Sequence, residues 1–480
     1  MPRTVAVVGG GISGLAACYH LVRAPHPPKV VLLEASGRFG GWLQSSRTPE
    51  GAVFEHGPRG VRPAGAAGAE TLHMVSELGL AGDILAVPKG HPAARNRFLY
   101  LGGTLHPLPS GLGGLLRAVP PFSRALFWSA LRDLLTPAGT GPDESAHAFA
   151  RRRFGPEVAE LAVDSLCRGV FAGDSRALSA RSCFPALFRA ERRRGSVLLG
   201  MALGHGERRA GPEVALARRA RAERWSQWSL RGGMESLATA LVAFVSPRGA
   251  ELRCHAPLRH LCHRRGRWQL TLPDRTITAD HVISALPASA LAQALSPEAE
   301  PLARELRAIR AASVAVVNLQ YEGATLPVTG FGHLVPSSED PALLGIVYDS
   351  VAFPELDGTP GTTGTPSLRL TVMLGGAWFR DIFGDPSAVA PELLLRRARE
   401  AVREHLGLPG TPTRAMVRVQ QDCIPQYTLG HWERLERIQR FLEEQELPLS
   451  LIGASYSGVS VNDCISSAKA AVGRILGFPP

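Results

Sequence analysis

The stretch "VAVVGGGISGLAA", residues 5–17, decides the fold of this 480-residue chain. A β-branched run is followed by a glycine turn and then directly by an apolar helical pattern. "KVVLLE" (29–34) has the composition of a second buried strand, which completes a β-α-β unit of the usual length. The unit predicts an α/β fold with parallel strands covered by helices.

The glycine spacing of this turn is typical of dinucleotide-binding units. G-x-G-x-x-G falls on Gly9, Gly11 and Gly14, which allow the tight turn, the approach of a pyrophosphate and close helix packing. Glu34 ends the second strand, where an acidic residue binds ribose hydroxyls and disfavours a 2′-phosphate. A turn without a ligand is the alternative, and the strand–turn–helix context disfavours it. The predicted dinucleotide contacts here are Gly9, Gly10, Gly11, Ile12, Ser13, Gly14 and Glu34.

Composition excludes several classes of protein. The chain has 53 basic and 42 acidic residues, but it lacks the zinc-finger spacing or interleaved aromatics of a nucleic-acid-binding module. Seven scattered cysteines without a C-x-x-C pair indicate reduced thiols rather than a disulfide framework. The most apolar region, residues 111–135, is interrupted by arginines and prolines, so we expect it to lie on a bilayer rather than cross one. No cleavable presequence is visible before the first strand.

The pattern of strand and helix signals changes along the chain and divides it into three kinds of region. Strand signals fade near Asn96 and return near residue 225, which predicts a mostly helical insertion. A second sheet is expected from "SVAVVNLQY" (313–321) and "LRLTVMLGG" (368–376). The predicted division is a dinucleotide-binding domain in three parts (1–90, 212–290 and 412–480), a helical membrane-associated insertion (91–211) and a mixed-sheet substrate domain (291–411).

Five segments in order resemble the flavoprotein superfamily of amine oxidases, phytoene desaturases and protoporphyrinogen oxidases. They are the glycine turn with Glu34-x5-Gly-Gly, "FEHGPRG" (54–60), "LRGGMESLATAL" (230–241), Leu258 after "RCHAP", and "LIGASYSGVSVNDCISSA" (451–468). The resemblance implies a discontinuous Rossmann-like domain that binds one non-covalent FAD, with the last helix directed at the flavin pyrimidine. It adds as cofactor contacts Trp42, Gly57, Pro58, Arg59, Gly60, Leu258, Gly458, Val459 and Ser460.

Lysine usage separates the branches of this superfamily. Amine oxidases typically place a lysine near flavin N5, whereas this chain has lysine only at positions 29, 89 and 469. The strand that would carry such a lysine offers Met373 instead. Ordinary amine oxidation is therefore disfavoured. A polyamine or carotenoid-type oxidoreductase and a non-catalytic FAD-binding scaffold stay open as alternatives.

"DSLCRGVFAGDSRALS" (164–179) and "CIPQYTLGHW" (423–432) resemble the oxygen-dependent protoporphyrinogen oxidases of animal mitochondria. The resemblance implies six-electron oxidation of protoporphyrinogen IX by O₂, with hydrogen peroxide as by-product. It also implies a homodimer on the inner mitochondrial membrane, peripheral and facing the intermembrane space, with possible handover of product to ferrochelatase. From the residues alone we would expect a cytosolic protein.

Substrate contacts are also carried over from this resemblance. Arg97 has the position of an arginine that pairs with a propionate, although taken alone it could be one more solvated arginine. Gly169 has the position of a backbone carbonyl facing pyrrole nitrogens, and it could equally end a helix. The remaining implied contacts are Phe331, Leu334, Val347 and Met373.

Other residue patterns in the chain predict no further function. "CHAPLRHLCH" (254–263) contains cysteines and histidines, but strand alternation would scatter them over two faces, and the spacing matches no zinc pattern. The chain also lacks the G-x-S-x-G elbow of a hydrolase and the G-K-[ST] ending of a P-loop. We therefore predict no metal, and no catalytic side chain with certainty, because the flavin itself would accept the hydride.

Overall fold

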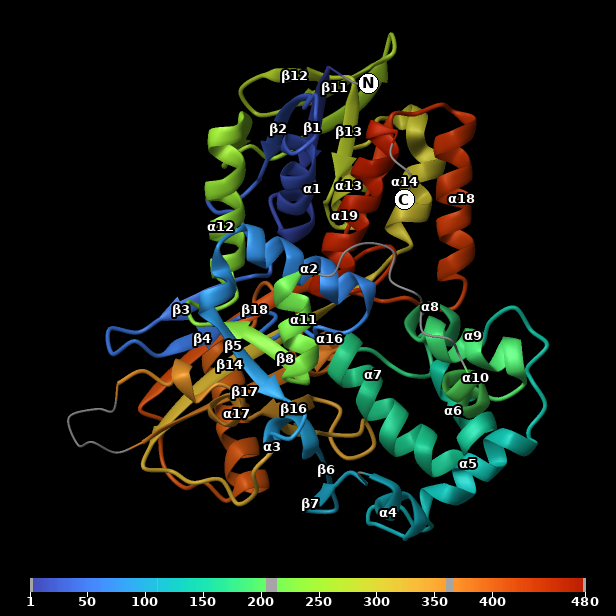
Figure 1. Cartoon of the computed structure of the whole chain (residues 1–480), viewed down its shortest axis with the longest axis vertical. Helices are drawn as coiled ribbons and strands as arrows, with labels where there is room; N and C mark the ends of the chain where they lie inside the picture. The colour runs from blue at the N-terminus through green and yellow to red at the C-terminus, as the bar shows by residue number, and fades with distance from the viewer. Residues whose placement is uncertain (1–2, 110, 204–213, 360–365, 478–480) are drawn as a thin grey trace.

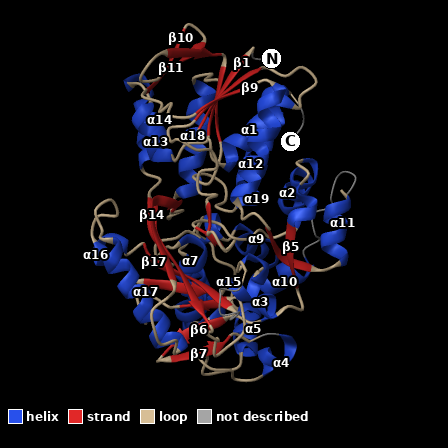
Figure 2. Cartoon of the chain, turned by 90° about the vertical axis from the view of Figure 1, so that its left-hand side faces the viewer, coloured by secondary structure: helices blue, strands red, loops and turns tan. Residues whose placement is uncertain are grey.

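The computed structural model describes residues 3–109, 111–203, 214–359 and 366–477. Figure 1 shows three parts: a sheet with helices on both sides at the top, a larger sheet at the lower left, and a lobe of helices at the lower right. Figure 2 shows that the two sheets lie at opposite ends of the molecule. The expected α/β class is confirmed.

The upper sheet is parallel and contains the predicted β-α-β unit. Its strand order is β19-β13-β1-β2-β9, with strand β1 (Thr4–Val8) at the centre. Alternate residues of β1 belong to different cores, since Val5 and Val7 pack on one face and Ala6 and Val8 on the other. The other strands are β2 (Lys29–Leu33), β9 (Ala250–Arg253), β13 (His281–Ser284) and β19 (Leu449–Leu451).

Helices from distant parts of the sequence cover this sheet. One face carries α1 (Ile12–Val22), α12 (Glu235–Val245) and α19 (Val461–Leu476), which share one hydrophobic core. The other face carries α13 (Ala288–Ala294), α14 (Glu300–Arg307) and α18 (His431–Glu444). A small antiparallel sheet lies on the same side, formed by β10 (His260–Arg264), β11 (Arg267–Thr271) and β12 (Thr276–Ala279).

The second sheet has seven strands in the order β18-β14-β17-β16-β15-β6-β7. Helix α17 (Pro391–Leu406) shares a core with one of its faces, which leaves the other face for the site described below. Its strands are β14 (Ala311–Glu322), β15 (Gly332–Leu334), β16 (Leu343–Val347), β17 (Ser367–Gly376), β18 (Arg414–Pro425), β6 (Phe98–Leu101) and β7 (Thr104–Pro107).

Our prediction of helical structure is wrong for residues 98–107. Strand β6 pairs with β15, which lies more than 230 residues further along the chain, at His333↔Phe98 and Leu334↔Leu99. A four-residue strand gives little local signal when its partner is so distant in sequence. The helical lobe therefore begins after β7.

The lobe itself consists of seven helices among the described residues. They are α4 (Gly111–Leu116), α5 (Leu126–Leu135), α6 (Ala146–Phe154), α7 (Asp164–Phe171), α8 (Ala180–Cys183), α9 (Pro185–Arg194) and α10 (Val197–Leu203), with a π-helical turn at Val158–Val163.

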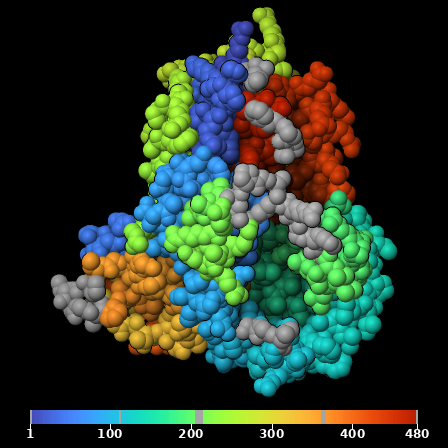
Figure 3. Space-filling view, viewed as in Figure 1, coloured from blue at the N-terminus to red at the C-terminus, as the bar shows by residue number. Residues whose placement is uncertain are grey.

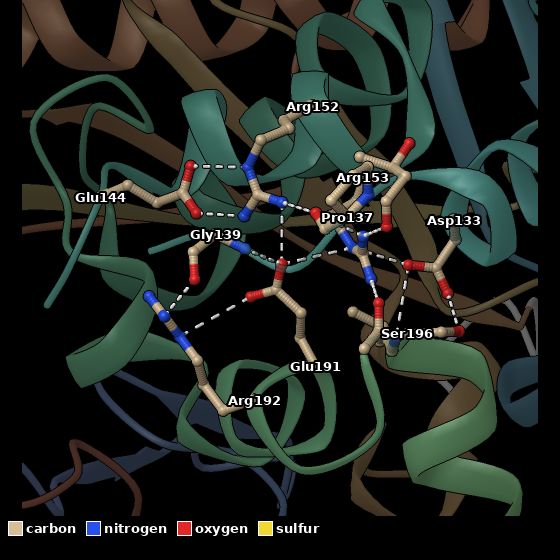
Figure 4. Close-up of polar contacts among 12 residues, drawn as sticks. Asp133, Pro137, Gly139, Glu144, Arg152, Arg153, Glu191, Arg192 and Ser196 are labelled. Atoms are coloured by element: carbon tan, nitrogen blue, oxygen red, sulfur yellow. Dashed lines mark hydrogen bonds and ion pairs between the residues drawn. The ribbon is translucent and has the colours of Figure 1, made fainter. Parts of the chain in front are cut away.

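A buried ion cluster joins these helices (Figure 4). Arg153, which is fully buried, lies 2.8 Å from Asp133 and 3.5 Å from Glu191. Arg152 extends the cluster by pairing with Glu191 at 2.8 Å and with Glu144. Asp133 also accepts hydrogen bonds from Ser196 and from the amide of Leu198, so it ties the start of α10 to α5. The arginine run at 151–153 is therefore partly interior.

The remaining described elements connect these three parts. They are β3 (Ser45–Arg47), β4 (Val53–Glu55), α2 (Gly65–Glu77), β5 (Ile84–Pro88), α3 (Pro92–Arg95), α11 (Ala215–Ala222), β8 (Trp225–Leu230), α15 (Asp349–Ala352) and α16 (Phe379–Phe383), with short 3-10 turns at Leu80–Asp83, Ser246–Arg248, Pro297–Ala299 and Pro354–Leu356. Part of the turn-rich loop at 356–367 lies outside the described residues. None of the helices in the described ranges is long and apolar enough to cross a membrane.

Candidate active site

The first glycine turn forms a backbone cradle at the start of α1. Gly9 has φ +102°, and a Cβ at Gly14 would lie 1.9 Å from the carbonyl oxygen of Gly9. Only glycine at position 14 lets the helix approach the strand so closely. Gly11 is the N-cap and supplies no side-chain cap, so no side-chain cap competes with an anion for the first amides of α1.

Glu34 fixes the second side of the cradle. Its carboxylate accepts a hydrogen bond from the amide of Gly10 at 2.7 Å and from the amide of Ser36 at 2.8 Å. The segment after β9 lies alongside, because the amide of Ala256 donates to the carbonyl of Glu34 at 2.8 Å. This contact brings the half-buried Leu258 to the same end of the sheet as Glu34.

The second glycine turn lies next to the first. The amide of Gly40 donates to the carbonyl of Gly10 at 2.8 Å. A Cβ at Gly57 would lie 1.9 Å from the carbonyl oxygen of Trp42, so these two backbones are in direct contact. The structure thus brings together Gly9–Gly14, Gly40–Trp42 and the Gly57–Gly60 turn, as a single dinucleotide site requires.

Arg59 is held from the opposite side by the second sheet. Its guanidinium forms an ion pair with Asp349 at 2.9 Å, and both side chains are nearly buried. Asp349 also accepts from the hydroxyl of Thr371 at 2.6 Å. Asn318 donates to Thr371 at 2.9 Å and to the carbonyl of Glu55 at 3.1 Å. The glycine turn is therefore attached at two points to β14, β17 and α15.

The C-terminal motif closes the cradle at the start of α19. Ser460 accepts from the amide of Asp463, and Asp463 accepts in return from the amide of Ser460, which is a capping box. Gly458 has φ +116°, and its amide donates to the hydroxyl of Tyr427 at 2.8 Å. Tyr427, from the "CIPQYTLGHW" segment, thus positions the turn that includes Val459. The sequence did not predict this capping box, and the carboxylate of Asp463 reduces the positive potential of the α19 N-terminus.

Apolar side chains form rows on the free face of the second sheet. Leu334, Gly345 and Met373 are register partners across β15, β16 and β17, so their side chains share one face. Val347 pairs with Thr371 in the next row of that face. The row therefore adjoins Thr371 of the Arg59–Asp349 network, and the expected substrate contacts lie opposite the glycine turns.

Helix α7 packs against this row from the lobe. A Cβ at Gly169 would lie 2.8 Å from a methyl of Leu334, so the backbone of α7 touches the leucine. The neighbouring Arg168 is fully buried and donates to the carbonyls of Val335 and Leu343 at 2.9 and 2.8 Å. Figure 3 shows a hollow between the lobe and the rest of the molecule, with the green of α7 at its floor. Arg168 thereby fixes the distance between that floor and the sheet.

Arg97 lies at the edge of the same sheet. It is exposed, and its guanidinium carbon lies 5.9 Å from the centre of the Phe331 ring. Among the described residues no carboxylate pairs with it. An unpaired guanidinium beside an aromatic ring can bind a carboxylate in bidentate geometry.

The comparisons with known proteins agree with this geometry. Residues 12–476 match the family model of flavin-containing amine oxidoreductases. The human protoporphyrinogen oxidase is 60% identical over the full length of both chains. The chain belongs to the flavin-containing amine oxidoreductases, and within them to the protoporphyrinogen oxidase family. A Bacillus subtilis coproporphyrinogen III oxidase is 27% identical over 99% of this chain and 98% of its own.

A solved structure of an Exiguobacterium protein shares the fold of these flavin-containing amine oxidoreductases. It is 23% identical, covers 99% of this chain and 98% of its own, and has a TM-score of 0.77. This likeness shows the fold, and the family match over residues 12–476 shows that the chain is a flavin-dependent oxidoreductase. On β17 of this chain, Met373 faces the site, at the place where an amine oxidase is expected to have a lysine.

Sequence reasoning missed acidic residues of this flavin-containing amine oxidoreductase site, among them Asp349, described above, and Glu55. Glu55 is buried and accepts from the amide of Met234 at 2.7 Å and from the hydroxyl of Ser45 at 2.8 Å. Burial raises its pKa from 4.5 to about 7, against the opposing effect of those two hydrogen bonds. The signal was present in "FEHGPRG" as an acidic residue on an apolar strand. No group of three His, Cys, Asp or Glu side chains in the described ranges is arranged to hold a metal ion.

Proposed function

We propose that this protein oxidises protoporphyrinogen IX to protoporphyrin IX, a six-electron reaction of heme biosynthesis in which O₂ is reduced to hydrogen peroxide. The observation that carries the proposal is that two features lie on the same sheet. One is Arg97, which is exposed and forms no ion pair with a described residue, and the other is the apolar row that contains Met373. A carboxylated apolar macrocycle matches both features. An amine substrate would be repelled by Arg97 and would find no lysine on β17.

The proposed cofactor is one non-covalent FAD per chain, and the residues present fit it. The open space at Gly11, where a Cβ would meet only the Cα of Gly41 at 3.8 Å, suits a pyrophosphate, and Glu34 lies where ribose hydroxyls would be bound. When bound, FAD would accept a hydride from a meso carbon and transfer electrons to O₂. The other proposed contacts are Ile12, Ser13, Trp42, Gly57, Pro58, Arg59, Gly60, Leu258, Gly458, Val459 and Ser460.

The chain's own residues bind and orient the substrate. Arg97 would hold a propionate, while Leu334, Val347 and Met373 would pack on the tetrapyrrole and exclude water from it. The carbonyl of Gly169 would accept a pyrrole N–H, and contact with Leu334 keeps this helix turn close to the macrocycle. Pyrrole protons can leave as the macrocycle tautomerises, so the reaction needs orientation more than a strong general base.

The direct test is an aerobic assay of the purified, flavin-loaded protein with protoporphyrinogen IX, followed by porphyrin fluorescence. We expect a rate well above autoxidation, and heat-denatured protein gives the background. Coproporphyrinogen III and a primary amine serve as competing substrates. A faster rate with either of them would overturn the proposal. Acid precipitation should release the flavin into the supernatant, whereas flavin retained in the pellet would contradict non-covalent binding.

The proposed location is the inner mitochondrial membrane, with peripheral attachment from the intermembrane-space side through the helical lobe. Exposed apolar residues gather on three neighbouring helices of the lobe, with Trp128 58% and Leu135 75% exposed. Arg117 and Arg124 flank them and could pair with anionic headgroups. The other members of this apolar patch are Leu115, Leu116, Phe127, Leu134, Leu198, Leu199, Met201 and Leu203.

Flotation with cardiolipin-containing vesicles tests this attachment. We expect Trp128→Glu with Leu135→Glu to abolish flotation, because both charges would enter the interface. Ile382→Glu, at a residue that is 40% exposed on α16 outside the lobe, is the matched control and should float normally. Equal flotation of both variants would contradict the assigned patch. Three further proposals rest on the family resemblance alone. They are a homodimer, handover of the product to ferrochelatase, and the division of the chain into five segments.

A further inference from the structure

A cavity lies between the helical lobe and the nucleotide-binding part. Its volume is about 860 Å³, within the range of about 300–1,000 Å³ typical of small-molecule sites. The lobe contributes residues of α8 and α9 and the loop at 140–142, and the opposite wall is formed by α18 and the turn at 456–460. The cavity therefore lies on the lobe side of the turn that contains Gly458.

The cavity is strongly cationic. Arg181, Arg189 and Arg192 line it, and among the described lining residues Asp463 is the one acidic side chain. The carboxylate of Asp463 is already engaged with the amide and hydroxyl of Ser460. The charges thus leave a net attraction for an anion.

Two of the arginines lie over aromatic rings. The guanidinium carbon of Arg181 lies 3.5 Å from the centre of the Trp432 ring, and that of Arg192 lies 4.8 Å from the centre of Phe188. Arg192 also donates to the carbonyls of Gly139 and Gly141, as Figure 4 shows for Gly139. Arg181 donates to the carbonyl of Pro142 at 3.2 Å. These side chains are preorganised, because their partners restrict their rotamers.

The third arginine, Arg189, is exposed on α9, and no described residue forms an ion pair with it. The rest of the lining is largely aromatic and apolar, with Phe171, Tyr427 and Val459 among its members. Planar guanidinium–aromatic pairs next to a free guanidinium suit a flat π-system that carries carboxylates, since arginine both stacks on rings and binds carboxylates in bidentate geometry.

We propose that this cavity binds the oxidised product, a planar tetrapyrrole dicarboxylate, at a site that adjoins the proposed flavin site and shares with it the turn of Gly458, Val459 and Ser460. The inference rests on the proposed function. The two sites share walls, because Gly169 contacts Leu334 on the substrate side while Val170 and Phe171 of the same helix line the cavity. The reduced substrate, with its tetrahedral meso carbons, is not flat and would stack less well. The cavity thus serves as a product-holding site next to the flavin turn.

Titration of the flavin-loaded protein with protoporphyrin IX, followed by porphyrin fluorescence, tests the proposal. We expect two porphyrins per chain for the unaltered protein. Arg189→Glu should weaken one of the two by at least about tenfold, because a carboxylate would then face the ligand's own carboxylates. Arg193→Glu, an exposed arginine of the same helix outside the cavity, is the matched control and should retain both.

Further arms separate the alternatives. One porphyrin per chain in the unaltered protein, or equal affinities for Arg189→Glu and Arg193→Glu, would overturn the inference. Displacement of the second porphyrin by stoichiometric oleate would identify the occupant as a lipid carboxylate and would also overturn it. The aerobic assay with protoporphyrinogen IX distinguishes the two failures, because turnover with a single porphyrin site leaves the proposed function intact.

Discussion

The interiors of the nucleotide-binding sheet and the helical lobe differ, because the lobe adds a buried ion cluster to its apolar cores. In the sheet, β1 places Val5 and Val7 in one apolar core and Ala6 and Val8 in another. In the lobe, Arg153 and Asp133 are completely buried as an ion pair. The first solution follows from local sequence, whereas the second depends on residues that meet only in the folded chain. The sheet region therefore depends on close contact between backbones, as at Gly14 and Gly9, whereas the lobe depends on the pairing of buried charges.

The largest effect is expected where backbones touch in the sheet region. Gly14→Ala places a Cβ 1.9 Å from the carbonyl oxygen of Gly9, where no side chain can move aside. We expect less than a tenth of the normal flavin content per chain, measured as the ratio of flavin to protein absorbance. Gly82→Ala, where a Cβ would meet nothing within 4 Å, is the control and should bind flavin normally. Normal flavin content in Gly14→Ala would contradict the cradle.

The corresponding change in the lobe removes one partner of the buried pair. Arg153→Met leaves Asp133 and Glu191 buried without this cation, and we expect a loss of roughly 3–5 kcal/mol in the free energy of unfolding of the lobe. Arg193→Met on the surface of α9 should change it by less than about 0.5 kcal/mol. Urea unfolding followed by circular dichroism measures both. Equal stabilities would show that the cluster contributes nothing.

An exposed arginine should behave differently from the buried one. Arg97 pairs with no described carboxylate, so Arg97→Ala leaves no charge stranded and should not destabilise the fold. We expect KM for protoporphyrinogen IX to rise roughly 10–100-fold through the lost carboxylate contact, with flavin content unchanged. Arg95→Ala, two residues away and also exposed, is the control for steady-state kinetics. Loss of flavin in Arg97→Ala would place this residue at the cofactor instead.

A further, pH-dependent effect concerns a buried carboxyl group that forms no ion pair among the described residues. Glu55 has a pKa of about 7, raised by burial from 4.5, so its protonated form is favoured by folding. Its stabilising contribution is fully present below about pH 4.5 and is lost as the pH rises through 7. Glu55→Gln does not titrate, so we expect it to gain about 2–3 kcal/mol relative to the unaltered protein between pH 5 and pH 8. A pH-independent difference in melting temperature would contradict this.

The same contrast explains what the sequence could predict. The glycine spacing and Glu34 predicted the β-α-β unit because each role is set within about thirty residues. The Arg59–Asp349 pair joins positions 290 residues apart. Strand β6 pairs with β15, which lies more than 230 residues further along the chain. Local sequence patterns report neither contact. Arg153 had the pattern of a solvated arginine run, because nothing local indicates that Asp133 and Glu191 lie beside it. The fold brings the predicted cofactor residues together at the glycine turns and the predicted substrate residues together on the free face of the second sheet. The roles of these residues stay predictions.

The ratio of oxygen consumed to porphyrin formed tests the central claim most directly. It is measured with an oxygen electrode and porphyrin fluorescence on the purified, flavin-loaded protein supplied with protoporphyrinogen IX, with and without catalase. Because six electrons leave the substrate in pairs, the account predicts about three O₂ consumed per protoporphyrin, falling by half with catalase. Porphyrin formation at the rate of the protein-free control, or a ratio that catalase does not change, would contradict it.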